Sequence, residues 1–195
     1  PEFVRDIILK ATSNDVMNSM SRSILSLATF DEKVNEMTLE NVLDQSLSLI
    51  ANFPLLAIYA YQAYNHIEKD ESLYIHYPDK NLTTAENILR LLRPDKQFTD
   101  TEAKVLDLTL ILHMEHGGGN NSTFTTHVVT SSGTDTYASV VASLSSLKGS
   151  KHGGANIKVA KMLDDIWKNI PDHTDEDAIF DYLCKILNKD KKKKK

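Results

Sequence analysis

Apolar residues recur at helical spacing through most of this chain of 195 residues, and no convincing run alternates apolar and polar residues as a strand would. Glycine, which tends to interrupt helices, is concentrated in two clusters, at 117–119 and 149–154. The pattern predicts an all-α protein of about eight or nine helices. A chain of this length is long enough to bury one good core, so one large domain is expected.

Capping residues locate the starts of several predicted helices, because their side chains accept hydrogen bonds from the first free backbone N–H groups. Candidates precede four apolar runs: Asn14 or Asp15, Thr83 or Thr84, Thr99 or Thr101, and Thr174 or Asp175. Glu102 is placed to complete a capping box. We also expect a long helix from Leu39 to about Ile67, interrupted or bent at Pro54.

The helix predicted for "TEAKVLDLTLILHMEH" has apolar residues on nearly every side of its second half. Such a helix is expected to be buried on most faces. It would place His113 and His116, three residues apart, on one side of its last turn. His113 is then more plausibly a structural residue, or one that supports a neighbouring site residue, than a catalyst.

Two helices rich in small residues follow, separated at Ser132–Gly133–Thr134 and ended at Lys148–Gly149–Ser150. Small side chains let helices approach closely. A further helix is expected to begin after His152–Gly153–Gly154.

Charge and composition narrow the class of protein. The formal net charge is −5 although the last five residues are all lysine, so the remainder is more acidic, at about −10. This argues against a nucleic-acid surface and favours a solvated tail for the lysines. The single cysteine, Cys184, cannot form an internal disulfide. No apolar run reaches a membrane span and no signal peptide is visible, so we expect a cytoplasmic protein or one of the mitochondrial matrix.

Three familiar chemistries fit the glycine-rich stretch poorly. His113, Glu115 and His116 match neither the H-E-x-x-H nor the H-x-x-E-H zinc pattern, so no metal site is predicted. The sequence "GGGNNST" lacks the lysine of a phosphate-binding P-loop, and no strand precedes it. Ser145 and Lys148 match S-x-x-K, but the partner motifs of that nucleophile are missing, which favours a helix C-terminal turn. His127 is assigned no role.

His116 and His152 share one local pattern, since each is followed by glycines and then by a helix start. Glycine lets the backbone approach a ligand closely. A helix N-terminus offers free N–H groups and favours anions such as carboxylates. It also favours a neutral imidazole, which can donate a hydrogen bond to a developing oxyanion. Two such sites would suit a substrate with several carboxylates and an enol intermediate.

Residues 110–156, "LILHMEHGGGNNSTFTTHVVTSSGTDTYASVVASLSSLKGSKHGGAN", resemble the central segment of citrate synthases. The shared pieces are H-x-[DE]-H with Gly and Asn, then S-T, then a small-residue helix pair, then K-G-x-x-H-G-G-A-N. Weaker likenesses are "TTAENILRLL", "VMNSMSRSILSLATF" and "FPLLAIYAYQAYN". The resemblance implies a multi-helix large domain of the citrate synthase fold, with long buried helices.

The resemblance also implies a homodimeric acyltransferase of the tricarboxylic acid cycle. This enzyme condenses acetyl-CoA with oxaloacetate and then hydrolyses the citryl thioester, without a metal or redox cofactor. On this pattern His116 binds oxaloacetate, and Asn120 lies in the adjoining contact region. His152 is the catalytic histidine that donates a hydrogen bond to the thioester carbonyl as the enol forms, with Gly153 beside it in the substrate-binding segment.

Several family features are not found. The motif G-x-G-H-x-V-Y, a later aspartate base and the carboxylate-binding arginines are missing, and "SNDVM" replaces a His-Pro-Met found in many relatives. We therefore expect residues 1–190 to form an incomplete large domain, with a lysine tail at 191–195 and no small domain. Without a positioned base, the isolated chain is predicted to be inactive or nearly so.

Other functions stay open at this stage. A 2-methylcitrate synthase or a citryl-CoA lyase-like relative would share the "HGGAN" motif. A different class of function, a non-catalytic helical dimerisation scaffold, is compatible with long helices that have small-residue faces.

Overall fold

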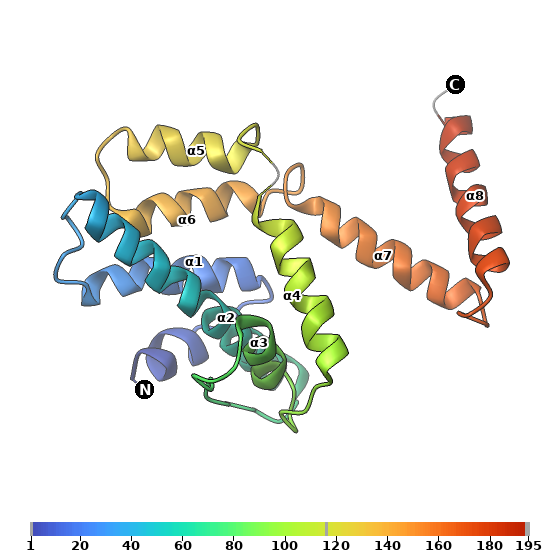
Figure 1. The fold of residues 1–195 in the computed structure, drawn as a ribbon, viewed down its shortest axis with the longest axis horizontal. Helices are drawn as coiled ribbons and strands as arrows, with labels where there is room; N and C mark the ends of the chain where they lie inside the picture. Colours follow the sequence, from blue (N-terminus) through green and yellow to red (C-terminus); the bar gives the residue numbers. More distant parts are fainter. Residues whose placement is uncertain (1, 116, 194–195) are drawn as a thin grey trace. The chain divides into compact units, whose positions relative to one another are not determined.

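The computed structural model describes residues 2–115 and 117–193, with side chains described as far as residue 188. In these residues the regular structure is entirely helical, which confirms the predicted all-α class (Figure 1). The elements are a π-helix η1 (Val4–Leu9), α1 (Val16–Leu27), a 3₁₀ turn η2 (Ala28–Phe30), α2 (Leu39–Lys69), α3 (Thr84–Leu92), α4 (Asp100–Met114), α5 (Asn121–Thr130), α6 (Thr136–Leu147), α7 (Gly154–Asn169) and α8 (Glu176–Lys193).

The chain divides into two compact units, residues 1–148 and residues 149–195. In unit 1, α5 packs on α6, α6 on α1, and α1 on α2, while α3 and η1 pack on α2 (Figure 1). The buried apolar cluster of this unit draws mainly on α1, α2 and α6, and it includes Ile8, Met20, Ile24, Leu49, Leu56, Ile58, Tyr59, Leu91, Tyr137 and Leu144. The assignment of residues 1–190 to a single large domain stays a prediction.

Helix α2 continues through Pro54 for 31 residues, so the proline does not interrupt it. By length and composition α2 would also qualify as a membrane span, which the sequence analysis did not find because polar residues such as Gln45 and Asn52 break up its apolar run. The central helix of a soluble protein meets the same criterion. Since α2 packs on α1, α3 and η1, this finding alone assigns no membrane role.

A polar network joins α2 to the start of α6 and to the turn after η2. The buried Gln45 accepts a hydrogen bond from Thr136 Oγ1 (2.5 Å) and donates one to Asp31 Oδ2 (2.8 Å). The Tyr137 hydroxyl donates to the same Asp31 oxygen (2.9 Å). Burial, together with this bond to a carboxylate, raises the pKa of Tyr137 to about 12. These contacts connect segments about a hundred residues apart, and so fix where α6 begins.

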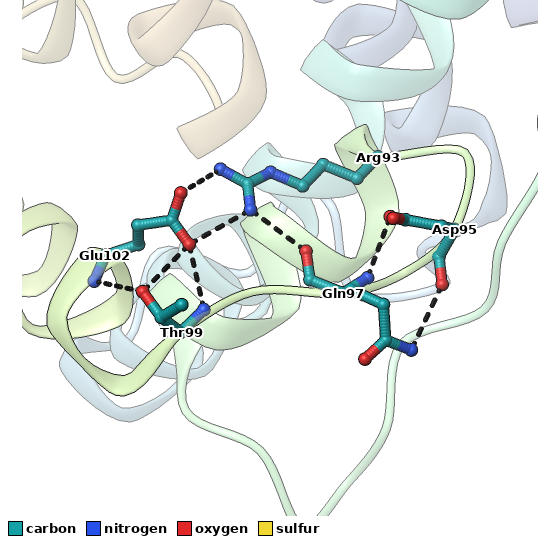
Figure 2. A network of polar contacts seen from close by, with 5 residues as sticks. All are labelled: Arg93, Asp95, Gln97, Thr99 and Glu102. Atoms are coloured by element: carbon teal, nitrogen blue, oxygen red, sulfur yellow. Dashed lines mark hydrogen bonds and ion pairs between the residues drawn. The ribbon is translucent and has the colours of Figure 1, made fainter.

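Most of the predicted caps are confirmed. Asp15 caps α1, Asp175 accepts from the Ala178 N–H at the start of α8, and Thr83 forms a capping box with Glu86 at α3. The start of α4 is held by a larger network, which Figure 2 shows in full.

At α4 the Thr99 side chain accepts from the Glu102 N–H (3.2 Å), and Glu102 accepts in return from the Thr99 N–H (2.8 Å). Arg93 donates to both carboxylate oxygens of Glu102 (2.6 and 3.1 Å), which ties the end of α3 to the start of α4. The hydrogen bond from Arg93, followed by those from Thr99, lowers the pKa of Glu102 to about 2.

The second half of α4 is exposed, and the prediction that this helix is buried on most faces is wrong. Leu108 and Ile111 are half exposed and Leu112 is 76% exposed, while Ala103 is the residue of α4 that is buried. The helix packs chiefly on α3. Apolar composition indicated that α4 needs a covering surface, but it did not indicate whether residues 1–148 provide one.

Unit 2 consists of α7, α8 and their connection. The Trp167 and His173 rings stack with centroids 3.6 Å apart, and His173 Nε2 donates to the Trp167 carbonyl (3.1 Å). Tyr182 on α8 donates to Asp165 on α7 (2.7 Å). Ile170, at the end of α7, is buried. The α7–α8 connection is therefore held mainly by local contacts.

Candidate functional site

The predicted oxaloacetate-binding loop lies between α4 and α5. Helix α4 ends at Met114 and Glu115 is extended, so the helix does not continue to residue 116 as the sequence suggested. His116 itself lies outside the described residues. Gly117 has φ +96°, a conformation that strains any residue with a Cβ atom. The backbone conformation at position 117 therefore favours glycine.

Two polar side chains bind the backbone of this loop. The Glu115 carboxylate accepts a hydrogen bond from the Gly117 N–H. Asn120 Nδ2 donates to the Gly117 carbonyl (3.2 Å) and to Thr123 Oγ1 (2.9 Å), and Asn120 Oδ1 accepts from the Thr123 N–H (3.0 Å). Asn120 is thus the N-cap of α5, and its amide group makes contacts inside the loop.

Helix α5 is held on α6 through hydroxyl groups, and Figure 1 shows the two helices side by side. Thr126 Oγ1 and Ser143 Oγ are 2.5 Å apart, and Ser122 Oγ donates to the Ser143 carbonyl (3.2 Å). Short side chains at these positions allow the close approach that the sequence predicted. The start of α5, and Asn120 with it, is consequently fixed to the core of unit 1 through α6.

His152 and Gly153 lie in unit 2, in the turn that opens α7. Their backbone N–H groups both donate to the Gly149 carbonyl, at 2.9 and 3.0 Å. Gly153 is the N-cap residue of α7, has ordinary dihedral angles (φ −81°, ψ 3°) and provides no side-chain cap. His152 is partly exposed. The helix predicted after His152–Gly153–Gly154 is confirmed, and its first residue is Gly154.

The predicted site residues belong to two units. Asn120 belongs to unit 1, while His152 and Gly153 belong to unit 2. The pairing of His116 with His152 around one substrate therefore stays a prediction.

The other candidate residues have local roles. His113 is exposed rather than buried, and its Nδ1 donates to the Thr109 carbonyl one turn earlier (2.7 Å). The expectation of a buried His113 is wrong for the same reason as for the rest of α4. His127 is exposed on α5. Among the side chains that the structure describes, residues 2–115 and 117–188, no three His, Cys, Asp or Glu side chains are grouped to hold a metal ion.

The S-x-x-K pair is a helix end. Ser145 Oγ donates to the Val141 carbonyl (2.8 Å), and Lys148 Nζ forms an ion pair with Asp15 (3.1 Å). Each residue thus has a partner other than the one that a nucleophile mechanism would need, which confirms the interpretation as a C-terminal turn.

Comparison with known proteins gives this geometry its context. The family model described as "Citrate synthase, C-terminal domain" matches residues 1–194. The chain belongs to the citrate synthase family. The resemblance noted in residues 110–156 therefore extends over nearly the whole sequence.

Individual relatives agree with this family assignment. A citrate synthase of Corynebacterium glutamicum is 30% identical over 179 residues, which is 89% of this chain and 38% of the relative. One from Deinococcus radiodurans is 32% identical over 150 residues, or 77% of this chain and 38% of the relative. The crystal structure of citrate synthase from Pyrobaculum aerophilum matches with a TM-score of 0.68 and 27% identity, covering 85% of this chain and 40% of that one. This citrate synthase-family chain thus spans about two fifths of the length of these relatives.

One loop contact was missed by sequence reasoning. The sequence analysis assigned Glu115 no role in this loop, whereas its carboxylate accepts from the Gly117 N–H. An acidic residue two positions before a glycine at a helix end is a weak signal for this bond, because short-range side-chain to backbone bonds are common in turns.

Proposed function

We propose that this chain supplies part of a citrate synthase active site, in which acetyl-CoA and oxaloacetate condense to citrate and CoA. The observation that carries the proposal is the position of His152 and Gly153 at the start of α7, in a chain that matches the family over residues 1–194. A helix start without a side-chain cap presents backbone N–H groups and the positive end of the helix dipole.

In the proposed reaction His152 acts as a neutral hydrogen-bond donor. A base removes a methyl proton from acetyl-CoA, and the electron pair moves toward the thioester oxygen to form the enol. His152 donates to that oxygen, and the N-terminus of α7 favours the developing negative charge. The enol carbon then bonds to the ketone carbon of oxaloacetate, and water cleaves the resulting thioester to release the CoA thiol.

We assign oxaloacetate binding to the loop after α4. His116 is the proposed direct contact. Asn120 already bonds to Gly117 and Thr123, so its proposed contribution is to hold the loop as well as to approach the substrate. The proposed assembly is a homodimer located in the cytoplasm or mitochondrial matrix.

The decisive experiment separates binding from turnover in the chain itself. Oxaloacetate is titrated into the ¹⁵N-labelled chain, and CoA thiol release is measured with both substrates. We expect saturable shifts near Gly117 and turnover far below that of complete citrate synthases. His116→Ala should abolish the shifts, whereas His127→Ala, which removes an exposed histidine from α5, should leave them unchanged. Absence of oxaloacetate binding would contradict the proposed function, and normal turnover would contradict the predicted inactivity.

A second candidate function, a helical dimerisation scaffold, is favoured by one observation. Exposed apolar side chains follow one another at three- and four-residue spacing on α2: Leu39, Leu43, Leu47 and Ile50. Residues at this spacing share a helix face. Light scattering together with the same titration separates the two functions, because a dimer that does not bind oxaloacetate would favour the scaffold. Comparing propionyl-CoA with acetyl-CoA as substrate addresses the 2-methylcitrate alternative.

A further inference from the structure

Both polar groups of one residue, Gly117, are held by side chains in the loop that follows α4. The Gly117 N–H donates to the Glu115 carboxylate, and the Gly117 carbonyl accepts from Asn120 Nδ2 at 3.2 Å. One of these side chains precedes the glycine by two residues and the other follows it by three. The two contacts therefore hold both backbone polar groups of Gly117.

These two contacts act on the glycine stretch 117–119, in which Gly117 and Gly119 have open space beside them. Gly117 and Gly119 have no neighbouring atoms within 4 Å of the position a Cβ would occupy, and Gly117 is exposed. Glycine has more conformational freedom than any other residue, so fixing three consecutive glycines costs more backbone entropy than fixing other residues. Hydrogen bonds from the flanking side chains offset part of that cost.

Asn120, one of the two residues that contact Gly117, is itself bonded to the folded part of unit 1. Asn120 is bonded through Oδ1 to the Thr123 N–H (3.0 Å) in the first turn of α5, and α5 is bonded to α6 through Thr126 and Ser143. The Asn120 side chain therefore connects Gly117 to the core of unit 1. Glu115 is the complementary contact from the α4 side.

We propose that Glu115 and Asn120 are positioning residues for the oxaloacetate loop, acting by holding the N–H and the carbonyl of Gly117. The inference rests on the proposed function, because Gly117 directly follows the proposed oxaloacetate contact, His116, in the sequence. It adds Glu115 to the working residues of the site, and it assigns Asn120 a role in holding the loop.

The first test replaces Glu115 in the full chain. Glu115→Ala removes the acceptor, whereas Glu115→Gln keeps a side-chain oxygen that can accept from the Gly117 N–H while removing the charge. Asp107→Ala is the matched control, since it removes an exposed carboxylate from α4. We expect Glu115→Ala to speed solvent exchange of the Gly117 amide proton about tenfold and to weaken oxaloacetate binding about tenfold, as loss of a charge-assisted hydrogen bond would. Glu115→Gln should stay within about threefold, and the control should not change.

The second test separates the contact of Asn120 with Gly117 from its capping of α5. Asn120→Asp keeps an oxygen to cap α5 but loses the donor to the Gly117 carbonyl, because an ionised carboxylate only accepts. Asn120→Ala loses both contacts. We expect both variants to perturb the Gly117 resonances, and we expect only Asn120→Ala to reduce the helical far-UV signal and stability. If Asn120 served only to cap α5, Asn120→Asp would leave the Gly117 resonances unchanged. That result would overturn the positioning role of Asn120.

The outcomes distinguish the inference from the function on which it rests. If Glu115→Ala binds oxaloacetate as tightly as the unsubstituted chain, the positioning role is overturned and the proposed function stands. If the unsubstituted chain does not bind oxaloacetate, the proposed function fails and the inference fails with it. Weakened binding in Glu115→Ala, recovered in Glu115→Gln, supports both.

Discussion

The two units of the chain contain similar helices but bury them very differently. In unit 1, α1, α2 and α6 share an apolar cluster in which Ile24 is fully buried. In unit 2, none of the 16 residues of α7 is buried, and Trp167 is 68% exposed. Apolar periodicity is present in both units. Periodicity therefore predicts a helix, whereas burial depends on which other segments are available to cover it.

Helix α7 also differs from the helices of unit 1 in how it begins. In unit 1, α1 to α6 each begin with a side-chain cap, and α4 has the additional Arg93–Glu102 ion pair (Figure 2). In unit 2, Asp175 caps α8, but α7 follows its N-cap residue Gly153 without a side-chain cap. The histidine proposed to act in catalysis thus precedes a helix that has neither a side-chain cap nor a buried residue. Stability measurements on the two units can test this contrast.

The largest expected effect is in the core of unit 1. Ile24→Ala should lower the free energy of unfolding by about 3 kcal/mol, because it removes buried methyl groups and leaves a cavity. Ile157→Ala on α7 should change it by less than about 0.5 kcal/mol, since Ile157 is 60% exposed. Urea unfolding followed by far-UV circular dichroism and by fluorescence checks both, because Trp167 is the single tryptophan and reports on unit 2.

Two results would contradict the proposed difference in stability between the units. Equal effects of the two substitutions would mean that α7 is covered by another surface in solution. A fluorescence transition that moves together with the circular dichroism transition in Ile24→Ala would mean that the units unfold as one.

Much of unit 1 was predictable because its signals are local. Each cap was placed at one of two nearby residues from the local sequence, and the structure has it at one of the two: Asp15, Thr83 and Thr99. The contact of Tyr137 with Asp31 was not predictable, because no local pattern links residues 106 positions apart. At the site, the start of α7 after His152 was predicted, whereas the role of Glu115 depends on the φ of Gly117 and the early end of α4.

The second prediction concerns this long-range polar network. Tyr137→Phe should destabilise unit 1 by about 1.5 kcal/mol, since it removes a hydrogen bond to a carboxylate. The pKa of Tyr137 is raised from 10.0 to about 12 in the folded chain, so its contribution is present below pH 10 and is lost as the pH rises toward 12. The unsubstituted chain should therefore lose stability between pH 10 and 12 more steeply than Tyr137→Phe. Parallel pH profiles would contradict this assignment.

The third prediction concerns the start of α4. Thr99→Ala should cost about 1 kcal/mol, as the loss of an N-cap usually does. Glu102→Gln tests the charge in the same network. The pKa of Glu102 falls from 4.5 to about 2 on folding, so its contribution is present above pH 4.5 and is lost as the pH falls toward 2.

The measurement for α4 is a comparison across pH. The gap in urea midpoint between the unsubstituted chain and Glu102→Gln should be constant near neutral pH and close as the pH falls from 4.5 to 2. Asp107→Ala is the control, because it removes another carboxylate of α4 outside this network. A gap that persists at pH 2 would show that Glu102 acts by packing rather than by its charge.

The smallest expected effect is at the start of α7, which lacks a side-chain cap. It tests whether the missing cap or the missing core limits the stability of unit 2. Gly153→Ser adds a capping hydroxyl at an N-cap position whose φ of −81° any residue can adopt. Serine and glycine differ by only a few tenths of a kcal/mol as N-caps, so unit 2 should gain about 0.3 kcal/mol, measured by Trp167 fluorescence. A gain above about 1 kcal/mol would mean that the missing cap, rather than the missing core, limits unit 2. A loss of similar size would mean that the turn at His152 requires glycine for close backbone approach, as a substrate-binding segment would.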